Sequence, residues 1–178
     1  MSLVDTLQTY VQLSVSTLYE VRLDTVTAQG ALVLSSIASY RGVQGHLMTI
    51  QDAVQNAFVK WIADASSFWM ALEIDVPSGT WVFTAGSDAG NPPTYIHWLY
   101  GHPLLGSNSS NCATFNGSSG RWVDAGCGEY FPYVVEYDCG QGYVFGPSSC
   151  IGLRHDNLEE EDRFIFLMQT SMLVLPQV

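Results

Sequence analysis

The hydrophobic pattern of this chain changes its period after residue 65. Before that point, two segments carry apolar side chains at helical spacing, and the clearer of them directly follows Asp52. After that point, apolar and polar residues alternate in short runs that are separated by Gly, Pro, Ser and Asn. Two helices followed by many short strands predict an α+β fold rather than a repeated βαβ unit.

The expected elements follow from these periods. The alternation over residues 18–23 predicts an edge strand, and a first helix is expected over 26–40, with Asp24 or Thr25 as its N-cap. The second helix, over 53–65, is expected to bury an apolar stripe that includes Trp61. Short strands are predicted over residues 68–74, 80–84, 95–99, 112–115, 121–124 and 133–137.

Two polar stretches, over residues 85–93 and 100–111, contain too few apolar side chains to pack by themselves. Long loops on a compact scaffold commonly carry function. The sequence therefore places candidate binding residues in these loops.

The charge balance limits the partners. Six basic and seventeen acidic residues give a net charge of −11, which argues against nucleic acid and anionic membranes as partners and favours a basic partner over an acidic one. No run of about 20 apolar residues could form a transmembrane span. Residues 1–16 do not resemble a signal peptide.

The four cysteines point to an oxidising compartment. Cys112, Cys127, Cys139 and Cys150 include no CxxC pair, and no histidine lies at zinc-finger spacing, so disulfides are expected rather than a metal site. Sequons at Asn108 and Asn116 agree with a secreted glycoprotein. We expect an extracellular or cell-surface location, as part of a larger secreted or membrane protein.

From about Leu18 to Cys139, the order of short motifs resembles a C-type lectin-like domain. Each motif is weak alone, but eight of them follow in the order and spacing of the family. The motifs are Gly45-His-Leu-Met-Thr-Ile50, Gln55-Asn-Ala-Phe58, Phe68-Trp-Met-Ala-Leu72, Gly79-Thr-Trp-Val-Phe83 with Gly86, Tyr95-Ile-His-Trp98, Cys112, Trp122-Val-Asp124 with Cys127, and Pro132-Tyr-Val-Val-Glu136.

The resemblance implies two helices that flank small antiparallel sheets, and a long loop region that forms the binding face. It implies a disulfide between Cys112 and Cys127. The second common bridge of the family is missing, since its places fall near Ile37 or Ala38 and at Val135, where apolar packing is expected instead. Cys139 would then pair with Cys150. The chain divides into an N-terminal extension (1–17), the lectin-like domain (18–139) and a C-terminal appendage with an irregular tail (140–178).

The calcium chemistry of sugar-binding members is largely missing from the motifs. The first ligand triplet is replaced by His102-Pro103-Leu104, and Ser110 and Asn111 stand where an acidic residue is expected. The last triplet, Trp122-Val123-Asp124, keeps one carboxylate. Because calcium requires six to eight oxygen ligands, we expect neither a bound metal nor another cofactor. The family's proline at position 103 is cis, so the same is expected here.

The resemblance implies a non-catalytic recognition domain, with carbohydrate binding that does not depend on calcium. The candidate ligand contacts are His102, Asn108, Asn111 and Asp124, although Asp124 could instead support the loop backbone. Trp98, Trp122 and Glu136 are expected to be structural. The alternative is a protein–protein interaction or adhesion module, so the partner is a glycan or a cell-surface protein. No motif for an enzyme accompanies the dispersed histidines.

Overall fold

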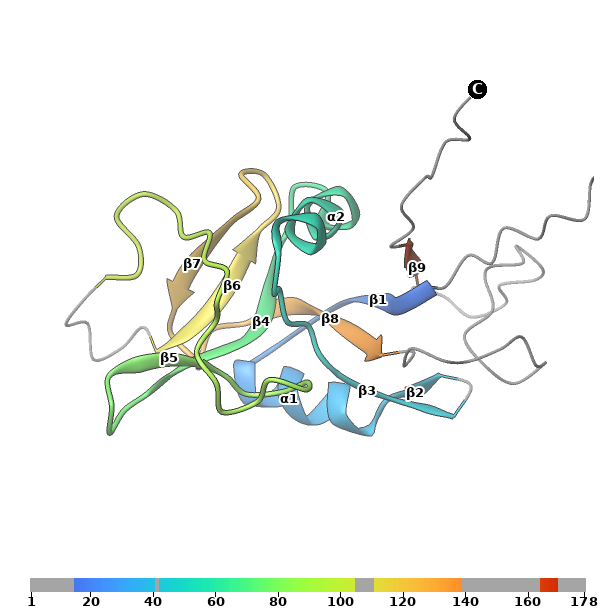
Figure 1. Cartoon of the computed structure of the whole chain (residues 1–178), viewed down its shortest axis with the longest axis horizontal. Coiled ribbons are helices and arrows are strands. Elements are labelled where there is room, and N and C mark those ends of the chain that lie inside the picture. The colour runs from blue at the N-terminus through green and yellow to red at the C-terminus, as the bar shows by residue number, and fades with distance from the viewer. Residues whose placement is uncertain (1–14, 41, 105–110, 139–163, 170–178) are drawn as a thin grey trace, which may run out of the picture.

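The computed structural model describes residues 15–40, 42–104, 111–138 and 164–169, and Figure 1 shows the arrangement of the elements. In chain order the elements are β1 (Val15–Val26), α1 (Ala28–Ile37), β2 (Ser39–Tyr40), β3 (Val43–Leu47), α2 (Ala53–Ala63), β4 (Ser67–Asp75), β5 (Thr80–Phe83), β6 (Cys112–Asn116), β7 (Arg121–Ala125), β8 (Phe131–Asp138) and β9 (Phe164–Gln169). This order confirms the predicted α+β class.

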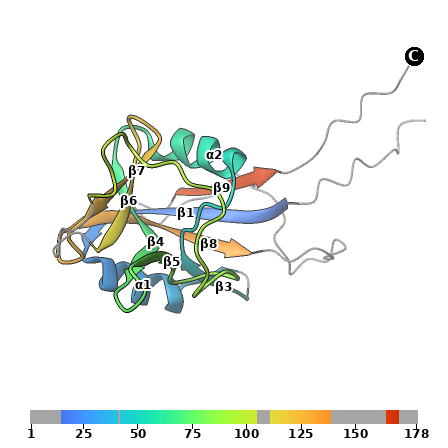
Figure 2. The same cartoon turned by 60° about the vertical axis from the view of Figure 1, so that its left-hand side comes forward.

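One branched sheet organises the molecule. Its main path runs β2-β3-β8-β4-β6-β7, while β5 pairs with β4, and β1 pairs with both β8 and β9. Neighbouring strands are antiparallel except β4 and β8, which meet at the parallel pair Trp69 and Tyr133. The helices lie on opposite sides of this sheet in both views (Figures 1 and 2).

The strand predicted over residues 18–23 is correct, but its expected edge position is wrong. Leu18 is paired with Tyr137 of β8 on one side and with Leu167 of β9 on the other. The C-terminal tail, which was expected to be irregular, contains the strand β9. This strand pairs with β1 and extends the sheet. The division into three parts at residues 17 and 139 stays a prediction.

Helix α1 is shorter than predicted at both ends. Because β1 continues to Val26, the N-cap is Thr27, whose hydroxyl accepts a hydrogen bond from Gly30 N at 3.2 Å, and neither Asp24 nor Thr25 caps the helix. At the other end, β2 begins at Ser39. The buried face of α1 consists of Ala28, Ala31 and Ser35.

Helix α2 begins where predicted, but it buries a different face. The Asp52 carboxylate accepts hydrogen bonds from Val54 N and Gln55 N at 2.7 and 2.8 Å, as an N-cap does. The side chain of Trp61, expected in the core, is 70% exposed. The buried residues are instead Asn56, Val59, Ile62 and Ala63. On this face the polar Asn56 is buried and hydrogen-bonded, whereas Val54 and Trp61 are exposed to solvent.

Two apolar clusters cover the two faces of the sheet. The first joins α2 to the sheet through Val59, Ile62, Phe68 and Trp122. The second joins α1 to the other face through Ala28, Ala31 and Trp69. Trp69 Nε1 donates to Val26 O at 2.7 Å, so this large indole is both buried and satisfied.

The place of the missing second bridge is filled by packing, as expected. Val135 is 1% exposed and shares a cluster with Ala38. A Cβ added to Gly45 would lie 2.6 Å from Val135 Cγ1, so the packed side chain of Val135 leaves no room for a side chain at position 45.

Two tyrosine–glutamate hydrogen bonds connect β1 with β8. Tyr19 donates to Glu136 Oε1 at 3.1 Å, and Tyr137 donates to Glu20 Oε2 at 2.5 Å. Because Tyr19 stands opposite Glu136 while Glu20 stands opposite Val135, the two bonds lie on opposite faces of the sheet.

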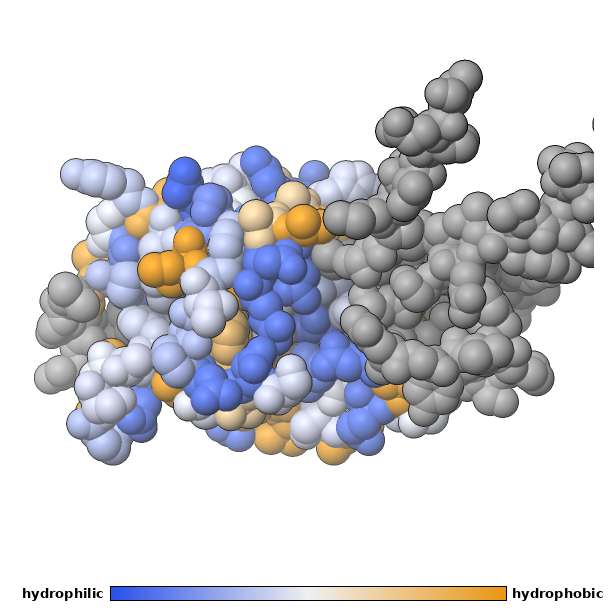
Figure 3. All heavy atoms as spheres, viewed as in Figure 1, coloured by the Kyte–Doolittle hydropathy of each residue, from blue (hydrophilic) through white to orange (hydrophobic). Residues whose placement is uncertain are grey.

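The surface shows no single large apolar area in the view of Figure 3, where hydrophobic residues form separate small groups among hydrophilic ones. Among the described residues, no helix is long and apolar enough to cross a membrane.

Candidate functional site

The long loop after β5 begins at a tightly held root, which we define as residues 83–91. Thr84 N donates to Ala71 O at 3.0 Å, and Phe83 exchanges two backbone hydrogen bonds, accepting from Gly90 N at 2.8 Å and donating to Asn91 O at 3.0 Å. Gly86 has a φ of +76° and lies against the imidazole of His46. The loop therefore leaves the sheet from a fixed position.

The strand predicted over residues 95–99 is wrong, because the segment is held mainly by aromatic packing. Only two backbone hydrogen bonds join it to β7, from Trp122 N to His97 O at 2.9 Å and from Leu99 N to Trp122 O at 2.8 Å. Trp98 lies 4.9 Å from Trp81 and 5.7 Å from Trp122 between ring centroids. Trp122 is fully buried and Trp98 packs against the same core, so both are structural, as expected.

His102 and Asp124 are brought together at the end of this loop. His102 Nδ1 lies 2.5 Å from Asp124 Oδ1, and Leu104 N donates to the same oxygen at 3.1 Å. An ionised carboxylate can only accept, so Nδ1 carries the proton and Nε2 faces away from Asp124. The His102–Pro103 peptide between these contacts is cis, as expected. Asp124 therefore supports the loop backbone from β7.

The arrangement around Asp124 does not suit a calcium ion. Its side chain is fully buried, and Oδ1 already accepts two hydrogen bonds. Oδ2 is buried and has no hydrogen-bond partner among the described residues. Within the same part of the chain, no three His, Cys, Asp or Glu side chains are grouped as metal ligands would be.

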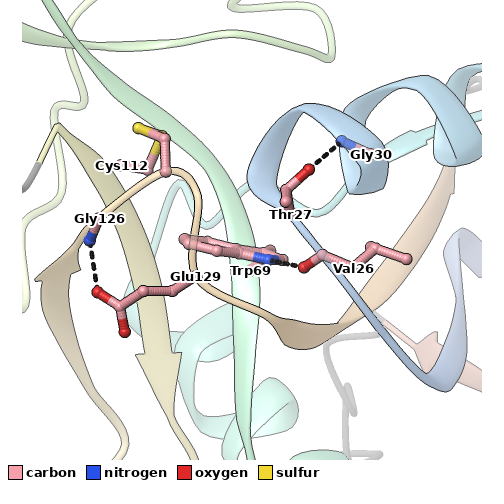
Figure 4. The surroundings of a disulfide bond; sticks show 8 residues. Val26, Thr27, Gly30, Trp69, Cys112, Gly126 and Glu129 are labelled. Atoms are coloured by element: carbon pink, nitrogen blue, oxygen red, sulfur yellow. Dashed lines mark hydrogen bonds between the residues drawn. A yellow bond between two sulfur atoms is a disulfide. The ribbon is translucent and has the colours of Figure 1, made fainter.

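A disulfide lies beside the site and confirms the pairing of Cys112 with Cys127. Its S–S distance is 2.00 Å, and it joins the start of β6 to the turn after β7 (Figure 4). In that turn, Gly126 N donates to Glu129 Oε1 at 2.8 Å. Cys127 O accepts from Ala28 N at 3.1 Å, which ties the turn to the start of α1.

The other predicted site residues are placed as follows. Asn111 directly precedes Cys112, and its carbonyl accepts from Ile74 N at 2.9 Å, so it lies at the same end of the β6–β7 hairpin as Asp124. Asn116 lies at the opposite end, where its side-chain oxygen accepts from both N and Oγ of Ser119 at 2.9 Å. Asn108, Cys139 and Cys150 lie outside the described residues.

Three exposed apolar side chains belong to the same loop as His102. Tyr100 is 99% exposed, and Ile96 and Leu104 are more than half exposed. Tyr100 belongs to the stretch over residues 100–111 in which the sequence analysis placed candidate binding residues. The role of Leu104 was missed, since a backbone N–H that binds a carboxylate leaves no signal in the sequence. We call Ile96, Tyr100, His102 and Leu104 the loop surface.

Comparisons with known proteins agree with this geometry. The family model described as the lectin C-type domain matches residues 40–137, which is more than half of the chain. A search of curated proteins finds no significant match.

Several solved structures are similar in fold. The carbohydrate-recognition domain of the mouse scavenger receptor C-type lectin has a TM-score of 0.59 and 22% identity, covering 69% of this chain and 91% of that chain. The C-type lectin CEL-I from Cucumaria echinata has a TM-score of 0.59 and 20% identity, covering 71% and 93%. Human lithostathine has a TM-score of 0.59 and 22% identity, covering 69% and 84%. At these identities the likeness concerns the fold alone.

Proposed function

This chain belongs to the C-type lectin domain family, and from that premise we propose that it is a non-catalytic recognition domain whose loop surface binds carbohydrate without calcium. The observation that carries the proposal is the engagement of Asp124. Its Oδ1 is held by His102 and by Leu104 N, so hydrogen bonds within the protein order the loop. A cation at this place would find Oδ1 of this carboxylate already occupied by both donors, and only Oδ2 without a donor among the described residues.

The loop surface offers the chemistry that sugars require. Tyr100 presents an almost fully exposed ring, on which the apolar face of a pyranose can stack. His102 Nε2, directed away from Asp124, can exchange a hydrogen bond with a hydroxyl. The amides of Asn111 and Asn108 are further proposed contacts, as the sequence analysis expected.

A glycan array, repeated in calcium and in chelator, tests this function. We expect the same sugars to bind in both buffers, and titration calorimetry on the best sugar to give equal affinities. Tyr100→Ala should weaken binding at least tenfold. The matched control is Tyr130→Ala, because Tyr130 is also exposed but lies on the turn beside α1. Binding that disappears in chelator, or that survives Tyr100→Ala unchanged, would contradict the proposal.

A second candidate function is recognition of a protein partner through the same residues. It is favoured by the exposed aliphatic side chains of Ile96 and Leu104, which offer no hydrogen bonds to a sugar. Leu104→Lys separates the two functions, since it should abolish docking of an apolar protein surface while leaving sugar stacking on Tyr100 in place.

An extracellular or cell-surface location and glycosylation remain proposals of the same kind. The Cys112–Cys127 disulfide supports an oxidising compartment. A glycan on Asn116 would lie at the far end of the hairpin from Asp124 and leave the loop surface open, whereas Asn108 belongs to the loop itself. Peptide mapping of protein from a secreting host, before and after glycosidase treatment, would show which sequon is used.

A further inference from the structure

A buried carboxylate on β8 joins several elements below the long loop. Glu136 is 1% exposed. Its Oε1 accepts from Tyr19 of β1 at 3.1 Å, and its Oε2 accepts from Thr49 N at 2.8 Å and from Thr49 Oγ1 at 3.0 Å. Gln55 Nε2 of α2 reaches Oε1 at 3.5 Å. Burial raises the pKa of Glu136 above its ordinary value, although His46 and Thr49 act in the opposite direction.

His46 lies between the carboxylates of β8 and the loop root. Its Nε2 is 3.1 Å from Asp138 Oδ2, and its Nδ1 is 3.9 Å from Glu136 Oε2 and 3.0 Å from Leu47 O. On the side of the loop, the ring packs against Gly86, where an added Cβ would lie 3.1 Å from His46 Cε1. The imidazole therefore lies between the carboxylates of Glu136 and Asp138 on one side and the backbone of Gly86 in the root on the other.

Every charged group that the described residues bring to His46 is negative. Burial alone lowers the pKa of His46, but the hydrogen bond to Asp138 and the charge of Glu136 outweigh it, and the pKa rises to about 8. Gly86 and Thr49, which line the remaining side, carry no charge. Tyr19 and Gln55 contact Glu136 and leave its charge unbalanced. A proton on His46 is thus the cation that balances these two carboxylates.

We propose that His46 acts as a proton-dependent clamp, which holds the loop root against Glu136 and Asp138 more firmly at mildly acidic than at mildly alkaline pH. When the proton is lost, the neutral ring no longer attracts the two carboxylates of β8, and the packing of β3 against β8 loosens. Gly86 then loses the rigid surface on which it rests. The inference concerns the root, and it holds whichever ligand the loop surface binds.

Hydrogen exchange of the root tests the clamp. Protection factors for peptides within residues 83–91, corrected for the intrinsic effect of pH, should fall by roughly tenfold between pH 6 and pH 9, as proton linkage at a displaced histidine predicts. Peptides from β6 and β7 should change little over the same range. A root whose protection is constant from pH 6 to pH 9 would overturn the proposal.

Two variants and one spectroscopic measurement complete the experiment. His46→Gln should make the root protection independent of pH, whereas the matched His97→Gln, in the exposed loop, should keep the wild-type dependence. In the wild-type protein, the NMR signal of the His46 Cε1 proton should titrate near pH 8, and Asp138→Asn should lower that midpoint. A midpoint at or below 6.5 refutes the clamp, even if His46→Gln fails to fold.

Discussion

At the scale of single residues, Asn56 joins α2 to the β6–β7 hairpin. Its side chain donates to Gly120 O at 2.9 Å and accepts from Trp122 Nε1 at 3.0 Å, and the residue is 6% exposed. Asn56→Ala leaves both partners buried without a hydrogen bond. We expect a loss of about 2–4 kcal/mol in the free energy of unfolding, measured by urea denaturation.

Gln29→Ala is the control for this prediction, because it removes an amide side chain from an exposed position of α1. Its effect should stay within about 0.5 kcal/mol. If Asn56→Ala is equally mild, the hydrogen bonds of Asn56 do not hold the hairpin.

Residue patterns predicted some of these contacts and not others. Asp52 was recognisable as a helix cap because the cap lies next to the helix it serves. Nothing near Asn56 in the sequence indicates that its partners are Gly120 and Trp122. The pairing of His102 with Asp124 is hidden for the same reason, since the fold brings together residues that lie in different segments.

At the scale of elements, α2 offers a matched pair of valines on its two faces. Val59 is fully buried, while Val54 is 62% exposed. Val59→Ala should cost about 2 kcal/mol, because it removes two methyl groups from a packed core and leaves a cavity. Val54→Ala should change stability by less than about 0.5 kcal/mol. Equal losses of unfolding free energy for the two variants, measured by urea denaturation, would contradict the assignment of Val59, and not Val54, to the buried face of α2.

Element types were predicted well, and their faces and ends less well. The short runs that became β4 to β8 are confirmed as strands, but β4, β6 and β8 are buried on both faces rather than on one. The apolar residues of 53–65 are compatible with more than one stripe, and tertiary contacts chose the stripe that includes Asn56. Within residues 95–99, Tyr95 and Trp98 pack on tryptophans rather than extend a strand.

The disulfide stabilises the hairpin by restricting the unfolded chain. Cys112 and Cys127 are separated by 15 residues, and a loop of that size contributes about 3 kcal/mol in the chain-entropy model. The double variant Cys112→Ala/Cys127→Ala should lose that amount in urea denaturation. Adding reductant to this variant is the control for Cys139 and Cys150. If the double substitution leaves the free energy of unfolding unchanged and the reductant lowers it, then the stabilising bridge is not the one between Cys112 and Cys127.

At the scale of the whole molecule, stability should depend on pH through His46. Its folded-state pKa of about 8 lies above the ordinary 6.5, so its contribution is complete below pH 6.5 and is lost as the pH rises through 8. The loss approaches about 2 kcal/mol. The raised pKa of Glu136, due first to burial, acts in the same direction. Urea denaturation at pH 6 and pH 9 measures the difference, which should shrink in His46→Gln.

The family and the α+β class followed from the order of eight motifs, because each motif marks a position in one common fold. The extra strand β9 had no such marker, since FIFLMQ by itself does not specify a partner. The ligand contacts assigned to His102, Asn108, Asn111 and Asp124 stay a prediction. The hydrogen bond between His102 and Asp124 could not be read from the sequence, because it depends on how the fold brings the two residues together.

The register of the outer strands has a mechanical consequence. Val15 stands opposite Gln169 at one end of the β1–β9 ladder, and Thr17 stands opposite Asp138 at the same end of the β1–β8 ladder. The hydrogen bonds of an antiparallel pair lie perpendicular to the strands. Tension applied through Val15 and Gln169 therefore opens this edge like a zipper, one pair of bonds after another, rather than shearing all of them together.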